Sequence, residues 1–201
     1  MIEASNLSRA QLRKTLRQTR KALPSTQQRA AARGLYRQLS QHPLFRRARS
    51  IALYLPNDGE IDPRPLLRCA QKRGKHTFLP VLSAWPRTKM VFQRVRPGDR
   101  LRANRFRIAE PIKRVRQQRR VWTLDLVLLP LVGFDDAGNR LGMGGGFYDR
   151  SLAYRARRAT WFKPTLLGLA HECQKVDRLE QAGWDVPLSG TVTDKRWYVA
   201  R

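Results

Sequence analysis

A continuous apolar run followed by a glycine-rich loop constrains the fold more than any other part of this chain. The run covers residues 126–132 and is interrupted only by Pro130. Such runs are typical of a strand that is buried on both faces, as in a parallel sheet. A polar turn at residues 135–139 follows, then four glycines within residues 142–146, and then a predicted helix that begins at Phe147. The pattern is therefore strand, glycine loop, helix.

This glycine loop is predicted to bind a phosphate chain. Glycine lets the backbone approach a ligand closely, and the N-terminus of a helix favours negative charge. The loop is not a Walker loop, because no Gly-Lys-Ser/Thr sequence follows it. It is not the dinucleotide fingerprint either, because Phe147 occupies the position of the third glycine. A tight turn without a ligand is the alternative, but ordering so many glycines is costly without a use.

The length and composition indicate a single domain, residues 1–201, in the cytoplasm. A chain of 201 residues is long enough for one hydrophobic core. It contains no apolar run long enough to span a membrane and no signal peptide, so no membrane association is expected. Its two cysteines, Cys69 and Cys173, are too few for a disulfide framework or a metal cluster.

Basic residues greatly exceed acidic ones. The formal net charge is +26, from 41 basic and 15 acidic residues. A charge of this size indicates an anionic partner or weak, non-specific binding to nucleic acid. Residues 94–120 contain eleven basic residues but only Asp99 and Glu110 as acids, and residues 96–120, which show little periodicity, are predicted to form a long basic connection. The alternative is an arginine-rich composition with a solvated basic surface.

The first predicted helix, residues 8–23, carries a row of four arginines. Arg9, Arg13, Arg17 and Arg20 are spaced at i, i+4, i+8 and i+11, which places them on one stripe. Like charges on one stripe disfavour a helix slightly unless an anion offsets them. The row either faces phosphates or forms a solvated face, and the residues alone favour the solvated face.

Helices and strands alternate along the rest of the chain. A second helix is predicted from a Ser25–Gln28 capping box to about Ser40, with strands at residues 50–55, 76–82, 165–170 and 197–200 and an edge strand or hairpin arm at 89–95. This order predicts an α/β fold, a single domain with a mainly parallel sheet flanked by helices in Rossmann-like layers. Ligands bind beyond the carboxyl ends of strands in such sheets, so Glu60, the glycine loop and His171 should lie along one rim. We interpret His171 as structural.

Three carboxylates are candidates for chemistry. Asp149 follows the glycine loop, where a Mg²⁺ ligand would meet substrate phosphates, although it also fits a helix-start carboxylate that offsets the helix dipole. Asp185, on a loop near the C-terminus, is a second metal candidate. Glu60 fits an acceptor for the edge of an amide-like ring, or else a solvated turn residue. The residues thus predict an α/β enzyme that binds a Mg²⁺-nucleotide or another polyanion, without defining the reaction.

Residues 128–150, LLPLVGFDDAGNRLGMGGGFYDR, closely resemble the signature of the 5-formyltetrahydrofolate cyclo-ligase (5,10-methenyltetrahydrofolate synthetase) family. The resemblance extends to the first helix, to LPNDGE at 55–60, to FLPVL at 78–82, to MVF at 90–92 and to WDVP at 184–187. It implies an ATP- and Mg²⁺-dependent cyclisation of 5-formyltetrahydrofolate to 5,10-methenyltetrahydrofolate, with release of ADP and phosphate and a phosphorylated formyl intermediate.

The resemblance also implies roles for individual residues. ATP would be bound by Arg9, Arg13, Arg140, Leu141, Gly142, Met143, Gly144, Gly145, Gly146, Phe147 and Tyr148. The folate would be bound by Leu55, Glu60, Gly144, Gly145, Gly146 and Phe147, and the metal by Asp149 and Asp185. No side chain is implied as a nucleophile; instead Gly144, Gly145, Gly146 and Tyr148 would position the reactants.

One position departs from the family pattern, because Arg9 stands where the family usually has lysine. Arginine is a planar fork and lysine a point charge, so the phosphate geometry there is in question. We hypothesise that residues 94–120 attract the polyglutamate tail of cellular folates. A monomer with no specific nucleic-acid partner is expected. Two rival interpretations are a nucleic-acid-binding protein, although the basic stretch lacks regularly interleaved aromatic residues, and a small-metabolite kinase with the same ATP site.

Overall fold

The structure is a computed structural model that describes residues 7–83, 85–86, 88–157, 163–183 and 185–200, with the side chains of residues 156 and 157 excepted. Its large sheet contains β1 (Ser50–Ala52), β2 (His76–Leu82), β3 (Met90–Val95), β6 (Gln118–Arg119), β7 (Leu126–Pro130), β10 (Thr165–Leu169), β11 (Gly190–Val192) and β12 (Trp197–Val199). The helices are α1 (Arg9–Lys21), α2 (Ser25–Ser40), α3 (Pro43–Arg47), α4 (Arg64–Lys72), α5 (Phe147–Leu152) and α6 (Tyr154–Arg157). Short 3₁₀ turns cover Val115–Gln117, Val121–Thr123 and Glu172–Gln174.

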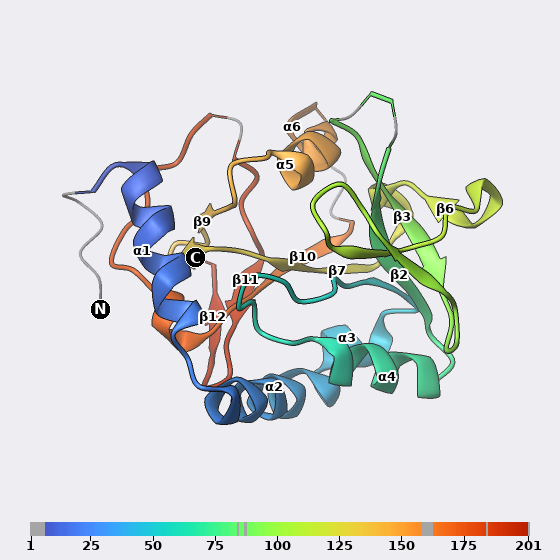
Figure 1. The fold of residues 1–201 in the computed structure, drawn as a ribbon, viewed down its shortest axis with the longest axis horizontal. Helices are drawn as coiled ribbons and strands as arrows, with labels where there is room; N and C mark the ends of the chain where they lie inside the picture. Colours follow the sequence, from blue (N-terminus) through green and yellow to red (C-terminus); the bar gives the residue numbers. More distant parts are fainter. Residues whose placement is uncertain (1–6, 84, 87, 158–162, 184, 201) are drawn as a thin grey trace.

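The sheet has a parallel centre and antiparallel edges. Its strand order is β12-β11-β10-β7-β1-β2-β3-β6 (Figure 1). Neighbouring strands from β11 to β2 pair in parallel, whereas β12, β3 and β6 pair antiparallel. Helix α4 joins β1 to β2, and α5 with α6 joins β7 to β10, as expected for βαβ crossovers, whereas the connection from β10 to β11 contains the 3₁₀ turn Glu172–Gln174. The predicted mainly parallel α/β sheet is confirmed.

Strand β7 lies between β10 and β1, and its apolar sequence explains that position. Leu126 and Leu128 pack into the core beneath the sheet, and Val127 and Leu129 pack into the core above it. All four side chains are at most 1% exposed. Because successive side chains of a strand point to opposite faces, a strand without polar alternation can be accommodated only where both faces are covered.

The helices form two covering layers and one flank. In Figure 1, α2, α3 and α4 lie below the sheet and α5 and α6 above it. Helix α1 lies to one side, next to the small β8 (Gly133–Phe134) and β9 (Arg140–Leu141) hairpin, where Leu12 and Leu16 pack against Val132 and Leu141. No helix within the described ranges is long and apolar enough to cross a membrane.

The basic segment at residues 96–120, predicted to form a long connection, contains strands of its own, so that prediction was wrong. It forms a hairpin of β4 (Leu101–Ala103) and β5 (Ala109–Pro111), then a 3₁₀ turn, then β6 on the edge of the sheet. The buried Glu110 carboxylate accepts from the Leu82 backbone N–H at 3.1 Å and so joins the hairpin to β2. Strands of two or three residues are too short to show alternation in sequence.

The predicted capping box at Ser25 was also wrong. Pro24 has an extended backbone (ψ 150°) and is itself the N-cap, so the helix begins at Ser25, whose side chain makes no cap bond. A capping box instead starts α1, where Ser8 Oγ accepts from Gln11 N–H and the Gln11 side chain accepts from Ser8 N–H. The predicted helix at residues 147–158 is interrupted at Ala153 and gives α5 and α6; residue 158 lies outside the described ranges.

Candidate functional site

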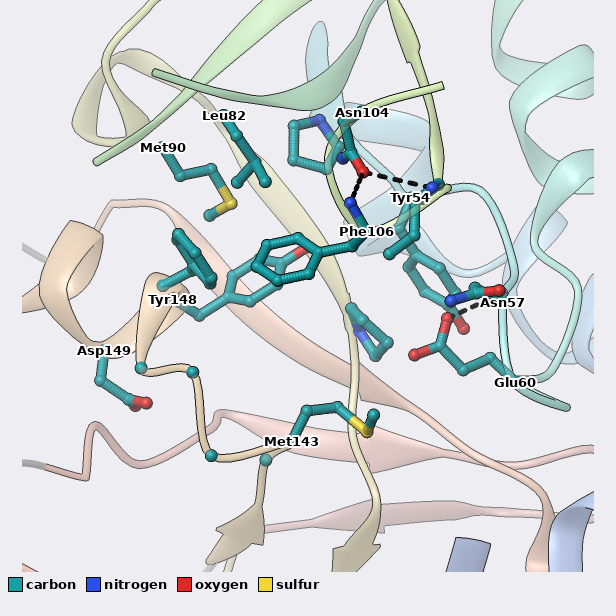
Figure 2. Close-up of a pocket in the computed structure, with 18 of the residues that line it drawn as sticks. Tyr54, Asn57, Glu60, Leu82, Met90, Asn104, Phe106, Met143, Tyr148 and Asp149 are labelled. Carbon is teal, nitrogen blue, oxygen red and sulfur yellow. Dashed lines mark hydrogen bonds between the residues drawn. The ribbon is translucent and has the colours of Figure 1, made fainter. Parts of the chain in front are cut away.

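A cavity of about 630 Å³ opens beyond the carboxyl ends of β1, β2 and β7. Its walls include the first turns of α1, the turn after β1, the tip of the β4–β5 hairpin, the glycine loop with the start of α5, and the loop that carries Asp185. Figure 2 shows Glu60 and Asp149 on opposite sides of this cavity, with the Phe106 ring between them in that view. This is the rim at which an open parallel sheet presents its loops to a ligand.

The structure brings the predicted site residues together with one exception. The cavity is lined by Arg9, Arg13, Leu55, Glu60, Arg140, Gly142, Met143, Gly144, Gly145, Gly146, Phe147, Tyr148, Asp149 and Asp185. Leu141 does not line it, because its side chain is 1% exposed and packs against α1 in the core. His171, interpreted as structural, lies behind the turn, with Nε2 3.2 Å from the carbonyl oxygen of Gly59.

Backbone conformation and two arginines fix the shape of the glycine loop. Gly144 has φ +91° and Gly146 has φ +61°, a left-handed conformation that glycine adopts without steric cost. The carbonyl oxygen of Gly142 accepts from Arg13 Nε at 2.9 Å, and that of Gly145 accepts from Arg150. Gly146 is also the N-cap of α5, so the loop leads directly into a helix N-terminus.

The arginines of α1 do not form a solvated face, and that interpretation was wrong. Arg9 donates to Asp185 Oδ2 at 3.0 Å and to the Glu180 carbonyl oxygen at 2.7 Å. Arg17 pairs with Asp58 at 2.7 Å, and Arg20, 0% exposed, donates to the same carboxylate at 3.0 Å. Helical spacing identified the stripe correctly, but only the fold could show that loops with acceptors cover it.

Arg9 and Arg13 differ in how many of their guanidinium nitrogens donate hydrogen bonds to the protein. The fork of Arg9 spans two acceptors on the segment that carries Asp185, which a lysine ammonium would engage with different geometry. Arg13 uses Nε for Gly142, and its terminal nitrogens have no hydrogen bond within the described part of the chain. Burial, followed by the repulsion from Arg9, lowers the pKa of Arg13.

Arg140 connects the start of α5 to the segment after Asp185. Its guanidinium is almost fully buried and donates to Asp149 Oδ1 and to the carbonyl oxygen of Val186. The Asp149 carboxylate is therefore held by a charge-assisted bond rather than by the helix N-terminus alone. Arg140 thereby links the two carboxylate-bearing walls of the cavity.

Asp149 and Asp185 both fit as ligands of a cation that arrives with phosphates. In each carboxylate one oxygen is held by arginine, and the other, Asp149 Oδ2 or Asp185 Oδ1, has no hydrogen bond from a described residue. Mg²⁺ is commonly held by one or two carboxylates together with substrate phosphates. No group of three or more His, Cys, Asp and Glu side chains suited to a metal is present in the described ranges.

Glu60 lies on the opposite wall in a largely apolar setting. Its Oε2 accepts from the Asn57 backbone N–H at 3.1 Å, and its Oε1 is 3.9 Å from the Arg20 guanidinium. Burial raises the pKa of Glu60 to about 7, against the opposing effects of Arg20 and Asn57. Burial and the nearby Glu60 also raise the pKa values of Tyr54 and Tyr148. A carboxyl group near its titration midpoint at neutral pH can accept or exchange protons with a bound ligand.

The sequence reasoning missed the apolar half of the cavity. These lining residues come from the ends of β1, β2 and β7, from β3 and from the hairpin tip: Tyr54, Asn57, Leu79, Pro80, Leu82, Met90, Asn104, Phe106, Ile108, Ala109 and Pro130. Phe106 packs edge-to-face on Phe147 of the glycine loop, with ring centroids 5.9 Å apart. For the hairpin tip, the signal in the sequence was a single phenylalanine among the arginines of residues 94–120.

The left-handed conformation of Gly144 predicts a difference between two glycines of the same loop. Gly144→Ala should lower the free energy of unfolding by about 1–2 kcal/mol, because a Cβ is strained at φ +91°. In the matched control Gly142→Ala, the added Cβ meets nothing within 4 Å, so the free energy of unfolding should stay within about 0.5 kcal/mol of wild type. Urea denaturation measures both. Equal effects at the two positions would contradict the described loop conformation.

Comparison with known proteins places this chain in one family. The model of the 5-formyltetrahydrofolate cyclo-ligase family matches residues 5–194. The 5-formyltetrahydrofolate cyclo-ligase of Haemophilus influenzae is 39% identical over 184 residues, covering 90% of this chain and 94% of the relative. That of Escherichia coli K12 is 37% identical over 183 residues, covering 90% and 97%.

Solved structures agree with the sequence comparisons. The 5,10-methenyltetrahydrofolate synthetase of Aquifex aeolicus superposes with a TM-score of 0.83 at 29% identity, over 97% of this chain and 94% of that one. The corresponding protein of Mycoplasma pneumoniae shares the fold, with a TM-score of 0.72 at 24% identity over 94% and 99%. The family signature, the relatives and the fold coincide, and the chain belongs to the 5-formyltetrahydrofolate cyclo-ligase family.

Proposed function

We propose that this protein catalyses the ATP-dependent cyclisation of 5-formyltetrahydrofolate to 5,10-methenyltetrahydrofolate, with Mg²⁺ as cofactor. The observation that carries the proposal is that one cavity contains a phosphate-type glycine loop, two cationic side chains of α1, and Glu60 within an apolar wall. These are the parts needed to hold a polyphosphate against a flat ring system. Membership in the family supplies the reaction.

The chemistry needs positioning more than a protein nucleophile. The formyl oxygen attacks the γ-phosphorus of ATP, and ADP leaves. N10 then attacks the activated carbon, the carbon–oxygen bond breaks, phosphate leaves, and N10 loses its proton. Phosphoryl transfer of this kind depends on orientation and on stabilisation of charge on the phosphoryl oxygens. Arg9, Arg13 and the amides of the glycine loop would stabilise that charge.

The two sides of the cavity suit the two reactants. ATP would lie along Arg9, Arg13, Arg140 and residues 142–148, where the cations and the α5 N-terminus are found. The folate would lie along Leu55, Glu60 and Phe147, with the Glu60 carboxylate accepting hydrogen bonds from the pterin edge. Gly144, Gly145 and Gly146 would contact both, which would bring the formyl oxygen to the γ-phosphate.

Asp149 and Asp185 would hold Mg²⁺ with their remaining carboxylate oxygens. A metal held there would supply positive charge to offset the charge that develops on the phosphoryl oxygens during transfer. Arg140 and Arg9 orient the two carboxylates from behind. The protein would thus offer the metal two carboxylates, Asp149 and Asp185, that arginines already hold in place.

A direct assay tests the proposal. Purified protein is mixed with 5-formyltetrahydrofolate and Mg-ATP, and the near-ultraviolet absorbance of the methenyl product is followed, with controls lacking ATP or Mg²⁺. We expect absorbance to grow only in the complete mixture. A flat trace from folded protein that binds ATP would contradict the proposal. A stable phosphorylated product would then indicate a metabolite kinase, and a salt-resistant, sequence-dependent gel shift would indicate a nucleic-acid-binding protein.

Asp149→Asn should reduce kcat by about a hundredfold or more and raise the Mg²⁺ concentration needed for half-maximal activity, because a neutral amide is a poor Mg²⁺ ligand. The matched control is Asp136→Asn, whose carboxylate pairs with Lys175 at 2.8 Å outside the cavity and should leave both quantities unchanged. Thermal unfolding confirms that both variants fold. Near-normal activity of Asp149→Asn at limiting Mg²⁺ would remove Asp149 from the metal site.

Glu60→Gln should raise the KM for 5-formyltetrahydrofolate about tenfold, the effect of losing a charged hydrogen-bond acceptor, and leave the KM for ATP unchanged. In the wild type the folate KM should rise as pH falls below about 7, because protonation of Glu60 removes the carboxylate. That pH dependence should be absent from Glu60→Gln. An unchanged folate KM with a weakened ATP KM would reverse the assignment.

The basic hairpin forms one wall of the cavity, which supports its proposed role in attracting the polyglutamate tail of folates. Arg100 and Arg102 are exposed on it, and replacing both with glutamine should raise the KM for a pentaglutamyl substrate about threefold without changing that of the monoglutamate. Arg33→Gln with Arg37→Gln, exposed on α2, is the control. If the two substrates have equal KM values at low and at high salt in the wild type, the hypothesis is wrong.

A further inference from the structure

The guanidinium of Arg20 is buried behind the residues that line the cavity. Its side chain is 0% exposed and does not line the cavity. Nε donates to the Asp58 carbonyl oxygen at 2.8 Å, Nη2 to Asp58 Oδ2 at 3.0 Å, and Nη1 to the Leu131 carbonyl oxygen at 3.1 Å. Nη2 also lies 3.9 Å from Met143 Sδ. A buried charge without a use is costly, so this arrangement needs an explanation.

The partners of Arg20 are all on segments that shape the cavity. Asp58 belongs to the turn that presents Glu60, Leu131 directly follows β7, and Met143 belongs to the glycine loop. Through its hydrogen bonds, Arg20 therefore joins the turn that carries Glu60 to the end of β7 with one rigid fork. A lysine could not make these bonds at once, because its ammonium is a single point.

Arg20 is not required to neutralise Asp58. Arg17 pairs with that carboxylate at 2.7 Å and Lys21 pairs with it at 2.9 Å, both from the more exposed side. What distinguishes Arg20 from these two neighbours is its proximity to Glu60, with Nη2 3.9 Å from Glu60 Oε1. The three cations thus share the Asp58 carboxylate. Among the described ion pairs, only that of Arg20 also reaches Glu60, the residue proposed to bind the folate.

Resting on the proposed folate-binding role of Glu60, we propose that Arg20 is a positioning residue that fixes the turn at residues 57–60 against the end of β7 and favours the carboxylate form of Glu60. The charged and titratable groups that face Glu60 are Arg20 from α1, Asp58 within the turn, Tyr54 beyond β1 and Tyr148 from α5. Arg20 is the one cation among them. It opposes the effect of burial, which raises the pKa of Glu60.

The ionisation of Glu60 can be measured without any turnover. The chain contains five glutamates, so protein labelled with ¹³C at the glutamate carboxyl group gives few resonances, and the one absent from Glu60→Gln identifies Glu60. We expect Arg20→Met to shift the Glu60 titration upward by about one pH unit or more, because the nearby cation is lost. Arg17→Met, the matched control that removes an Asp58 partner without a contact to Glu60, should leave the titration in place. Equal titrations in wild type and Arg20→Met would overturn the proposal.

Steady-state kinetics tests the positioning role. At neutral pH, Arg20→Met should raise the KM for 5-formyltetrahydrofolate about tenfold or more, leave the KM for ATP unchanged, and shift the pH dependence of the folate KM upward together with the Glu60 titration. Arg17→Met should retain the wild-type folate KM and pH profile. A parallel loss of folate and ATP affinity in Arg20→Met would show a merely structural role.

Arg20→Lys covers the case in which Arg20→Met does not fold. It keeps the charge but loses the fork, so the Glu60 titration should stay close to wild type while the folate KM still rises several-fold. A folate KM within twofold of wild type in Arg20→Lys would overturn the proposal. The carboxyl titration needs no activity, so a protein that fails to cyclise folate would refute the proposed function and leave this test intact.

Discussion

Guanidinium groups hold the irregular half of this molecule in place. Backbone hydrogen bonds between strands and apolar packing on both faces hold the sheet together. The described loops around the cavity have no such regular backbone pairing. Arg13 holds the glycine loop, Arg20 holds the turn before Glu60, and Arg140 holds Asp149. Each of these side chains donates to a backbone carbonyl or a carboxylate of a segment remote in sequence. The site geometry depends on those bonds, since bidentate and charge-assisted hydrogen bonds are both stronger and more directional than neutral ones.

The same interactions explain how a chain with a net charge of +26 builds a site for two anionic reactants. The cations nearest the cavity are partly neutralised by fixed acceptors, so they are oriented before any ligand arrives. Arg13 retains terminal nitrogens without a partner in the described part of the chain, and burial lowers its pKa, so a bound phosphate would meet a poorly solvated cation. Asp149 and Asp185 are likewise oriented by arginines rather than free on a loop. Residues 94–120, which include the hairpin that borders the cavity, carry eleven of the 41 basic residues and two of the 15 acidic ones.

Strong local patterns predicted the sheet and most of the site, and long-range contacts account for what they missed. The apolar run of β7 and the glycines after it could be read directly, because burial on both faces and left-handed φ values leave few residue choices. Arg20 could not, because helical periodicity shows which residues share a stripe but not what covers it. The β4–β5 hairpin has strands of three residues, so Phe106 gave no periodic signal. Leu141, inside the signature, packs in the core cluster with Leu12 and Leu16 of α1, a long-range contact that the signature does not show.

The proposed function depends on transfer of the γ-phosphoryl group of ATP to the formyl oxygen of the folate. Oxygen labelling can follow that transfer. With ¹⁸O in the formyl group of 5-formyltetrahydrofolate, we expect each turnover to release inorganic phosphate carrying one ¹⁸O, because that oxygen leaves with phosphorus in the phosphoryl-transfer route. Mass spectrometry detects this phosphate as an increase of about two mass units. Unlabelled phosphate, formed at the same rate as the methenyl product, would mean that ATP is hydrolysed without activating the formyl group and would contradict the proposed transfer.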